Sequence, residues 1–394
     1  MKLRFRPLIA LVVSAIGFGV TPARADPVAD WYEASTAMGG QARSQVALAM
    51  FEAANAIDRR YESYLGVPAA TSPANADIAV AVAAHGVLKF AYPGQAGPLK
   101  IALDYDLGQV ADGPEKTAAI AIGQSVAELT MKRVTTSSAV AADYLPAATP
   151  GLYVPTDLPV LSMGAYQNKP WLMTRPDEFA PKPPPPLTSD AWAKSYDEVR
   201  RLGRKTGSER TPFQTAAAQF WANNNPDLAF RMLTAAPGRS LVKNAHFYAM
   251  VAMGMADAHV AMTVAKYDNH FWRPITAIRN GEKDGNPKTA PDSGWEPLLG
   301  TPLHPEYPCG HCIMAATIAT VVAGEFGNAA RMTFIDPGMP GAGQALTPAE
   351  YARNVSMSRI YAGVHYRFSN EAAEGMGRKI GQRALTGYMK LLAK

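Results

Sequence analysis

Cysteine and charge are both scarce in this sequence. Its 394 residues include 2 cysteines, so at most one disulfide can form within the chain. The fold must therefore be held by burial of apolar side chains, for which the chain is long enough. Charged residues amount to 18% and the formal net charge is +5. Because four of the 38 basic residues and none of the 33 acidic residues lie within residues 1–25, the remaining chain is nearly neutral. The sequence gives no reason to expect nucleic acid as a partner.

Long apolar runs are also missing, except near the start. After residue 25, no apolar run reaches the roughly 18 residues needed for a membrane helix without a charged residue or a helix breaker, so no stable membrane span is predicted. Residues 1–25 combine a basic start, an apolar stretch from Leu8 to Val20 and the small-residue sequence Ala23-Arg24-Ala25. This order is typical of a cleaved signal peptide and predicts a periplasmic or secreted mature protein.

Strand-like alternation of Val, Ile and Thr between turn signals is nearly absent, so we expect an all-α fold. Apolar residues recur instead every three or four positions, the spacing of amphipathic helices. Proline-rich residues 142–188 predict an extended connector across the surface, which divides the chain into a helical half at 26–188 and another at 189–394. Long loops are expected at 279–308 and 334–347. Helices are predicted over residues 44–65, 76–91, 115–133, 189–203, 211–224, 226–235, 240–266, 312–327 and 348–362.

Both cysteines lie in the sequence YPCGHC, residues 307–312. Cys309 and Cys312 could form a redox dithiol, half of a zinc site, or a disulfide beside one wall of an oxyanion pocket. A dithiol enzyme would need a βαβ setting that the helical pattern does not offer. Zinc needs four ligands, and the chain has no second cysteine pair, although His304 and His311 are near. The oxyanion pocket is favoured because Gly310 and His311 open an apolar helix, and helix amino termini bind anions.

Two further segments carry cations. Lys266 and Arg273 are seven residues apart, which predicts that they share a helix face. Arg359 and His365 are six residues apart, so a bend eased by Gly363 must bring them together. Fixed cations and imidazoles, next to a helix start led by glycine, suit a tetrahedral oxyanion such as phosphate or vanadate.

In three places the sequence resembles a known superfamily. K-x6-RP (266–274), P-x-GH (308–311) and SR-x5-H (358–365) are similar, in order and spacing, to the signature of the vanadium-dependent haloperoxidases and type 2 phosphatidic acid phosphatases. FWRPITAIR, HPEYPCGH and SRIYAGVHYRF resemble the soluble bacterial haloperoxidase branch more than the membrane lipid phosphatases. The resemblance implies helical bundles with long active-site loops.

It also implies roles for residues. His365 would be the metal-binding residue, as axial ligand of vanadate, or the nucleophile of a phosphatase that takes phosphate esters as substrate. His311 would be the acid–base partner, and His304 occupies a position that is usually histidine in bromide-oxidising relatives. The oxygens of the anion would be held by the remaining site residues: Lys266, Arg273, Cys309, Gly310 and Arg359.

The implied reaction is the oxidation of halide, bromide or iodide above all, by hydrogen peroxide. An acid phosphatase acting on small phosphoesters and a non-catalytic oxyanion-binding protein are the alternatives, and a homodimer is compatible with each. Two positions depart from the superfamily pattern. Cys309 replaces a serine, and a thiol is a weaker hydrogen-bond donor than a hydroxyl. Ser369 replaces an aspartate that orients the last histidine in the phosphatases.

Overall fold

The computed structural model describes residues 26–39, 42–133, 149–158, 160, 169–223, 225–335 and 343–393. The expected signal peptide lies outside these residues. Within them the all-α prediction is confirmed. The α-helices are α1 (Pro27–Ala37), α2 (Arg43–Ile57), α3 (Ala76–Ala91), α4 (Ala96–Gly108), α5 (Pro114–Arg133), α6 (Asp190–Leu202), α7 (Pro212–Asn223), α8 (Asp227–Thr234), α9 (Leu241–Asn269), α10 (Pro274–Arg279), α11 (Gly310–Phe326), α12 (Pro348–Tyr361) and α13 (Arg367–Thr386). Short 3₁₀ turns span Pro93–Gln95 and Gly281–Lys283.

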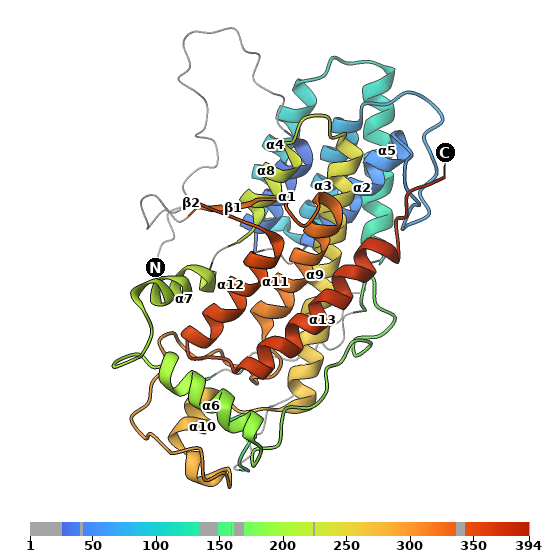
Figure 1. Ribbon diagram of the computed structural model, residues 1–394. Helices are drawn as coiled ribbons and strands as arrows, with labels where there is room; N and C mark the ends of the chain where they lie inside the picture. Colours follow the sequence, from blue (N-terminus) through green and yellow to red (C-terminus); the bar gives the residue numbers. More distant parts are fainter. Residues whose placement is uncertain are drawn as a thin grey trace, which may run out of the picture.

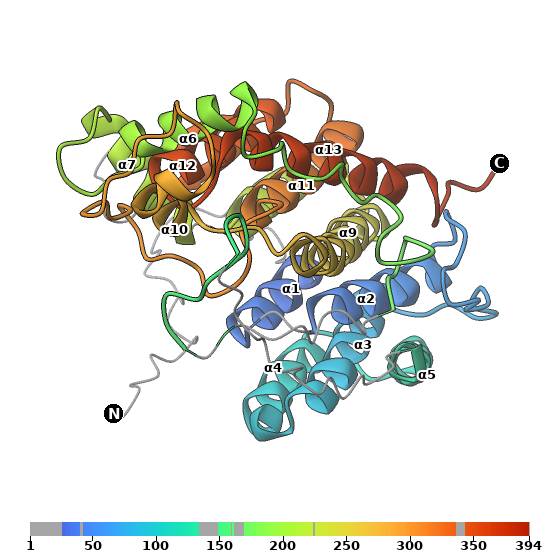
Figure 2. The same cartoon turned by 90° about the horizontal axis from the view of Figure 1, so that it is seen from below.

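Helix α9 is the centre of the molecule. In Figures 1 and 2 it lies between a layer of amino-terminal helices, with α2 next to it, and a layer formed by α11, α12 and α13. It is long and apolar enough to cross a membrane, but 78% of its most apolar 18-residue window is buried inside the protein. Its apolar character on all sides is explained by this position, since a helix with protein on every face has no polar side.

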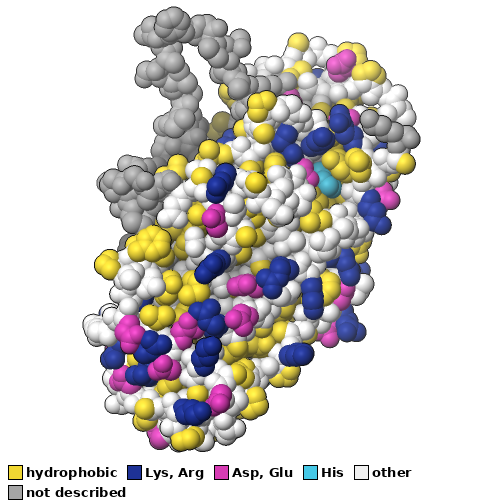
Figure 3. Space-filling model, viewed as in Figure 1, with side chains coloured by type: hydrophobic (Ala, Val, Ile, Leu, Met, Phe, Trp, Pro, Cys, Tyr) yellow, Lys and Arg dark blue, Asp and Glu magenta, His cyan; other side chains and the backbone are white. Residues whose placement is uncertain are grey.

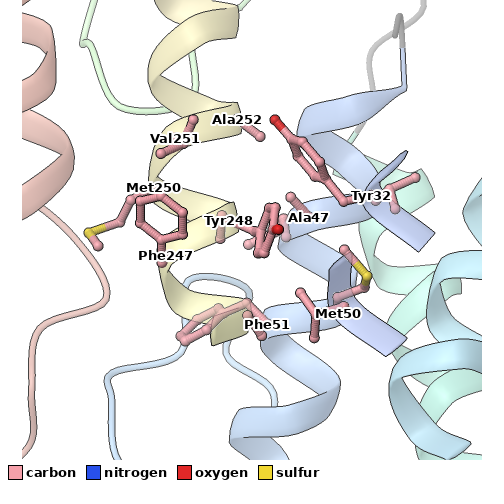
Figure 4. Close-up of a cluster of buried hydrophobic side chains, with 14 of the residues drawn as sticks. Tyr32, Ala47, Met50, Phe51, Phe247, Tyr248, Met250, Val251 and Ala252 are labelled. Carbon is pink, nitrogen blue, oxygen red and sulfur yellow. The ribbon is translucent and has the colours of Figure 1, made fainter. Parts of the chain in front are cut away.

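One large hydrophobic core extends across both predicted halves of the chain. Tyr32 of α1 and Phe51 of α2 pack towards Phe247 and Tyr248 of α9 (Figure 4). The rings of Tyr32 and Tyr248 lie 4.6 Å apart, in a tilted pair. Each such aromatic side chain removes a large apolar area from water. The division at residue 188 therefore separates segments of sequence that share a core.

The helix predicted over 44–65 ends early, at Ile57. Two buried side chains of α2 accept hydrogen bonds from the backbone that follows the helix. Asn55 Oδ1 accepts hydrogen bonds from the N–H groups of Arg60 (3.1 Å) and Tyr61 (3.0 Å). Glu52 accepts from the N–H of Tyr64 at 2.6 Å. These local bonds replace the helical ones, which the apolar spacing alone could not reveal.

The connector predicted to cross the surface is partly buried. Trp171, Leu172 and Met173 enter the core, and their backbone N–H groups donate to the carboxylate of Asp257 on α9 at 2.6–2.8 Å. Residues 181–186, which hold the proline run, are only partly buried or exposed. A buried carboxylate that accepts three backbone N–H bonds ties the connector to the central helix.

The loop predicted at 334–347 overlaps a small antiparallel hairpin, β1 (Met332–Ile335) and β2 (Gly343–Leu346). Helices α1, α4, α10 and α13 were not predicted. In α13 the pattern is masked by glycines, which are poor helix formers. Gly377 and Gly381 allow α13 to pack against α11, because a Cβ at either position would lie under 3.0 Å from atoms of that helix.

The face over α11, α12 and α13 carries Lys and Arg mixed with Asp and Glu (Figure 3). Several of these charges are paired, among them Arg367 with Glu198 and Arg383 with Glu178. Surface cations with acidic neighbours are the ordinary arrangement. The cations of the candidate site are arranged differently.

Candidate oxyanion site

Lys266 lies in the last turn of α9 and is 1% exposed. Its Nζ donates to the backbone carbonyls of Pro305 (2.9 Å) and Glu306 (2.7 Å). Burial, followed by the charge of Arg273, holds the pKa of Lys266 well below its usual value. The lysine thus joins α9 to the loop that leads into α11.

Arg273 does not share a helix face with Lys266, so that prediction is wrong. Helix α9 ends at Asn269, where His270 takes a left-handed conformation, and Arg273 is the amino-terminal cap of α10. The two cations approach each other through the 304–306 loop instead. Arg273 is fully buried, and its Nε donates to the His304 carbonyl at 3.0 Å. Its Nη1 lies 2.8 Å from the Val364 carbonyl and 3.3 Å from Nε2 of His365.

Arg359 lies in the last turn of α12 and is 4% exposed. Its Nε and Nη1 are buried and have no hydrogen-bond partner among the described residues. Burial, then repulsion from Arg273, lowers the pKa of Arg359 to about 10. Buried donors without partners are rare in folded proteins, because each costs the energy of its lost contact with water. These two nitrogens need an acceptor.

The bend predicted between Arg359 and His365 is present. Helix α12 ends at Tyr361, Gly363 has φ +78°, and α13 begins at Arg367. A Cβ at Gly363 would lie 2.4 Å from the carbonyl oxygen of Gly203. Glycine is required here both by the left-handed backbone and by this close approach. The bend places His365 within electrostatic reach of Arg273, Lys266 and Arg359.

His365 is 2% exposed and has a carboxylate partner that the sequence did not suggest. Its Nδ1 lies 2.7 Å from Oε1 of Glu306, a residue with no exposed surface. Glu306 Oε1 also accepts from the N–H of Tyr366 at 3.2 Å. Burial and then the charge of Arg273 lower the pKa of His365 far below its usual value, so the ring is neutral. With Nδ1–H donating to the carboxylate, Nε2 keeps its lone pair and faces the cations.

Helix α11 begins at Gly310, as expected for a helix-start wall of the site. His311 follows, and its side chain is reachable by solvent, yet protein atoms surround it closely. Desolvation, followed by the charge of Arg359, lowers the pKa of His311 to about 4. A Cβ at Gly310 would make only ordinary contacts with Met262, so the packing at this position does not itself require glycine.

Cys309 and Cys312 form a disulfide across the first turn of α11, and both are fully buried. Cys309 therefore has no S–H to donate to an anion, and its predicted role as a donor does not hold in this state. Its Sγ caps the helix by accepting from the Cys312 N–H at 3.3 Å.

Within the described residues, no group of three or more His, Cys, Asp or Glu side chains is placed to hold a metal ion, so nothing in that part of the chain forms a zinc site.

His304 lies against Arg273. Its Nδ1 lies 3.0 Å from Nη2 of Arg273, a donor, and 3.1 Å from the carbonyl oxygen of Pro305, an acceptor. Burial, then the charges of Lys266 and Arg273, depress the pKa of His304 strongly. The three sequence motifs and His304 thus meet in one place.

Buried positive charges outnumber buried negative charges in the candidate site. Lys266, Arg273 and Arg359 are buried, and none of them forms a salt bridge in the described part of the chain. Glu306 is the carboxylate that offsets Lys266 and Arg273 electrostatically, and burial raises the pKa of Glu306 to about 7. Buried cations are costly unless they are paired. The donor set and the partnerless nitrogens of Arg359 fit an oxyanion such as vanadate or phosphate.

Comparison with known proteins assigns the fold. Residues 246–394 match the family model described as the VCPO second helical-bundle domain. A bacterial vanadium-dependent iodoperoxidase superposes with a TM-score of 0.71 over 94% of this chain and 92% of its own, at 22% identity. The chain has the vanadium haloperoxidase fold. An apo-type bacterial vanadium-dependent chloroperoxidase gives a TM-score of 0.70 over 93% of this chain and 94% of its own, at 18% identity.

Among curated proteins, the vanadium chloroperoxidase of Curvularia inaequalis is 24% identical over 184 residues. This match covers 38% of the present chain and 30% of that enzyme. The range 246–394 contains every residue that the sequence proposed for the site, so the vanadium haloperoxidase resemblance and the oxyanion site fall on the same segment. Glu306 also lies within it. Glu306 is part of the HPEYPCGH motif, but no local signal in the sequence indicated that its side chain bonds to a histidine 59 residues away.

Proposed function

We propose that this protein is an exported vanadate-dependent haloperoxidase that oxidises bromide or iodide with hydrogen peroxide. The observation that carries the proposal is the set of three buried cations for which the described residues provide no salt bridge. Two nitrogens of Arg359 have no hydrogen-bond partner in the same part of the chain. The vanadium haloperoxidase fold supports the same reading. Bound vanadate would activate hydrogen peroxide for the two-electron oxidation of a halide.

The residues of the chain have separate tasks in this proposal. Lys266, Arg273, Arg359 and the N–H of Gly310 hold the oxygens of the anion, and their charge withdraws electron density from them. The Nε2 lone pair of His365 would hold the vanadium. Lys266 and Arg273 are already held by backbone carbonyls and His365 by Glu306, so these three need little reorganisation on binding.

His311 is suited to move a proton. It is more exposed than His304 and His365, and it is neutral at pH 7 because its pKa is lowered to about 4. A neutral imidazole at this place would accept a proton from incoming hydrogen peroxide and hold it for return to a departing oxygen.

His304 supports the choice of halide. Its imidazole lies next to the Arg273 guanidinium, whose positive charge favours an anion at this position. Bromide and iodide are easier to oxidise than chloride, so a site of this kind is expected to prefer them.

An acid phosphatase is the second candidate, favoured by the pairing of His365 with Glu306. An imidazole whose Nδ1–H is held by a carboxylate presents Nε2 as a nucleophile, and the same cations would hold a phosphoryl group. The two candidate enzymes would use the same anion-binding residues and differ in their substrates.

The test uses the purified full chain stripped of anions by dialysis. We expect bromide and iodide oxidation by hydrogen peroxide after addition of vanadate, none without it, and little hydrolysis of p-nitrophenyl phosphate. Hydrolysis without halide oxidation would assign the phosphatase. Tight vanadate binding with neither activity would assign the non-catalytic oxyanion-binding protein, and absence of vanadate binding would contradict all three. The serine variant Arg359→Ser serves as the inactive control.

Export is the remaining part of the proposal. The basic and apolar order of residues 1–25 supports it, and so does the disulfide between Cys309 and Cys312, because disulfides persist in oxidising compartments. Intact-mass analysis of exported protein should show the loss of residues 1–25, and retention of Met1 would contradict this part.

A further inference from the structure

Glu306 lies near the end of the loop between α10 and α11, shortly before α11 begins, and is held at three points. Its N–H donates to the Phe271 carbonyl at 2.8 Å, and its own carbonyl accepts from Lys266 Nζ at 2.7 Å. Its carboxylate accepts from His365 Nδ1 at 2.7 Å and from the Tyr366 N–H at 3.2 Å. A side chain fixed at both backbone and carboxylate cannot turn away from the histidine.

The opposite side of the imidazole agrees with this arrangement. Arg273 Nη1 lies 3.3 Å from Nε2 of His365, and a guanidinium can only donate. Nε2 must therefore accept, and the proton of the neutral ring must be on Nδ1, where Glu306 receives it. Two independent partners thus specify one tautomer.

The second observation concerns Ser369, one turn into α13. Its hydroxyl lies beside the Glu306 carboxylate and lowers the pKa of that group. Even so, neither Ser369 Oγ nor Glu306 Oε2 has a hydrogen-bond partner of normal geometry in the described part of the chain. The backbone of the same loop also joins α13 here, since the Cys309 N–H donates to the Ser369 carbonyl at 3.4 Å. The carboxylate therefore fills the space to which a longer acidic side chain at position 369 would point.

We propose that Glu306 is the positioning residue of His365. It keeps the proton on Nδ1, fixes the plane of the ring and makes Nε2 more basic, so that Nε2 points at the bound anion. The loop before α11 thereby supplies the carboxylate that position 369 lacks. The identity of the anion rests on the proposed function, whereas the tautomer and orientation of His365 do not.

Two simpler roles make different predictions. If Glu306 acted only as a charge, its removal would leave the site more positive, and every oxyanion would bind more tightly. If it acted only to hold the loop, its removal would weaken every oxyanion alike. A positioning residue affects the ligand that bonds to Nε2 and spares the ligand that does not.

Glu306→Gln is the variant, with vanadate and sulfate as the two probes of the anion-free protein. Both are tetrahedral oxyanions, but sulfate forms no bond to imidazole nitrogen. Titration calorimetry should show vanadate affinity falling about 10- to 100-fold, with sulfate affinity unchanged or higher. Glu198→Gln is the matched control, because it removes a carboxylate paired with Arg367 without touching His365. It should change neither affinity.

Parallel changes in the two affinities, in either direction, would overturn the proposal. A folding defect is separated by thermal unfolding, which should show both variants cooperatively folded. Adding Ser369→Asp to Glu306→Gln should recover part of the vanadate affinity, while Ser369→Asn, equal in size and uncharged, should not. Recovery by both or by neither would assign the effect to packing.

A ligand-free measurement keeps the proposal testable if vanadate does not bind at all. In ¹⁵N-histidine-labelled protein, the resonances of His365 are assigned by their loss in His365→Asn. They should show the proton on Nδ1, with that proton shifting upfield in Glu306→Gln. A proton on Nε2 would refute the positioning role whatever the protein binds. A proton on Nδ1 without vanadate binding would uphold it and contradict the proposed function alone.

Discussion

Arg359 brings two buried hydrogen-bond donors to the site, Nε and Nη1, that find no acceptor among the residues the structure describes. Arg359→Ala should therefore cost an oxyanion about 2–5 kcal/mol of binding energy, the usual loss for a buried charge-assisted contact. Calorimetric titration with vanadate and with phosphate measures this loss. Arg353→Ala is the matched control, because Arg353 lies on the same helix and is exposed. Equal affinity in the two variants would show that Arg359 does not face the anion.

Cys309 is one of the two positions at which the sequence departs from the superfamily pattern. Cys309→Ser removes the disulfide and puts a hydroxyl at the helix cap, where it can accept from the residue 312 N–H and donate to the anion. We expect tighter vanadate binding by about 0.5–1.5 kcal/mol, the contribution of one neutral hydrogen bond.

Cys312→Ser separates the two effects, since it breaks the same disulfide and leaves a thiol at 309. It should bind vanadate more weakly than Cys309→Ser. Reductant should shift the affinity of the unmodified protein and leave the Cys309→Ser variant unchanged. If Cys309→Ser binds no better than the unmodified protein, position 309 does not face the anion.

At the scale of elements, the site depends on the bend between α12 and α13. Gly363→Ala meets both a positive φ of +78° and the Gly203 carbonyl, and should destabilise the fold by roughly 3 kcal/mol or more. Gly207→Ala is the control, because its φ is +65° but the space around it is open; strain alone should cost it about 1 kcal/mol. Urea unfolding of both variants measures the difference, and similar losses would show that the contact with Gly203 is unimportant.

The motifs predicted the site well because they report chemistry that is local in sequence: a cation, a glycine-led helix start, a bend with glycine. The motifs failed to predict features that depend on tertiary contacts. Lys266 and Arg273 meet through a loop and not along a helix, and Glu306 acts across the fold. Helix α2 stops at Ile57 because Glu52 and Asn55 bond to the backbone beyond it, and an apolar period does not report such bonds.

At the scale of the whole molecule, His246 joins the central helix to the carboxy-terminal end. It is buried, stacks on Tyr61 with ring centroids 4.0 Å apart, and its Nε2 donates to the Met389 carbonyl at 3.1 Å. Its Nδ1 has no partner among the described residues. Burial lowers the pKa of His246 from 6.5 to about 4. His246 is therefore protonated at a lower pH in the folded state than in the unfolded chain.

Stability from this residue is therefore complete above about pH 6.5 and is lost as the pH falls towards 4, by about 3 kcal/mol in all. Chemical unfolding of the protein and of His246→Gln at pH 7.5 and pH 4.5 measures it. The loss between the two pH values should be smaller in the variant by up to about that amount. The difference between the two proteins isolates His246 from the other groups that titrate in the same range. Equal losses would show that His246 is protonated in the fold.

The excess positive charge around Arg359 also bears on how this chain stays folded. Lys266 and Arg273 lie at the junction of α9 and α10, whereas Arg359 lies far along the chain on α12. In the folded chain their mutual repulsion pushes α12 away from that junction. An anion between them reverses the sign of that force. At 100 times its dissociation constant, a ligand specific for the folded state adds about 2.7 kcal/mol to stability. The anion is then an electrostatic cross-link between α9, the 304–309 loop and α12, a constraint of the kind that a chain with 2 cysteines, both committed to one turn of α11, cannot make covalently.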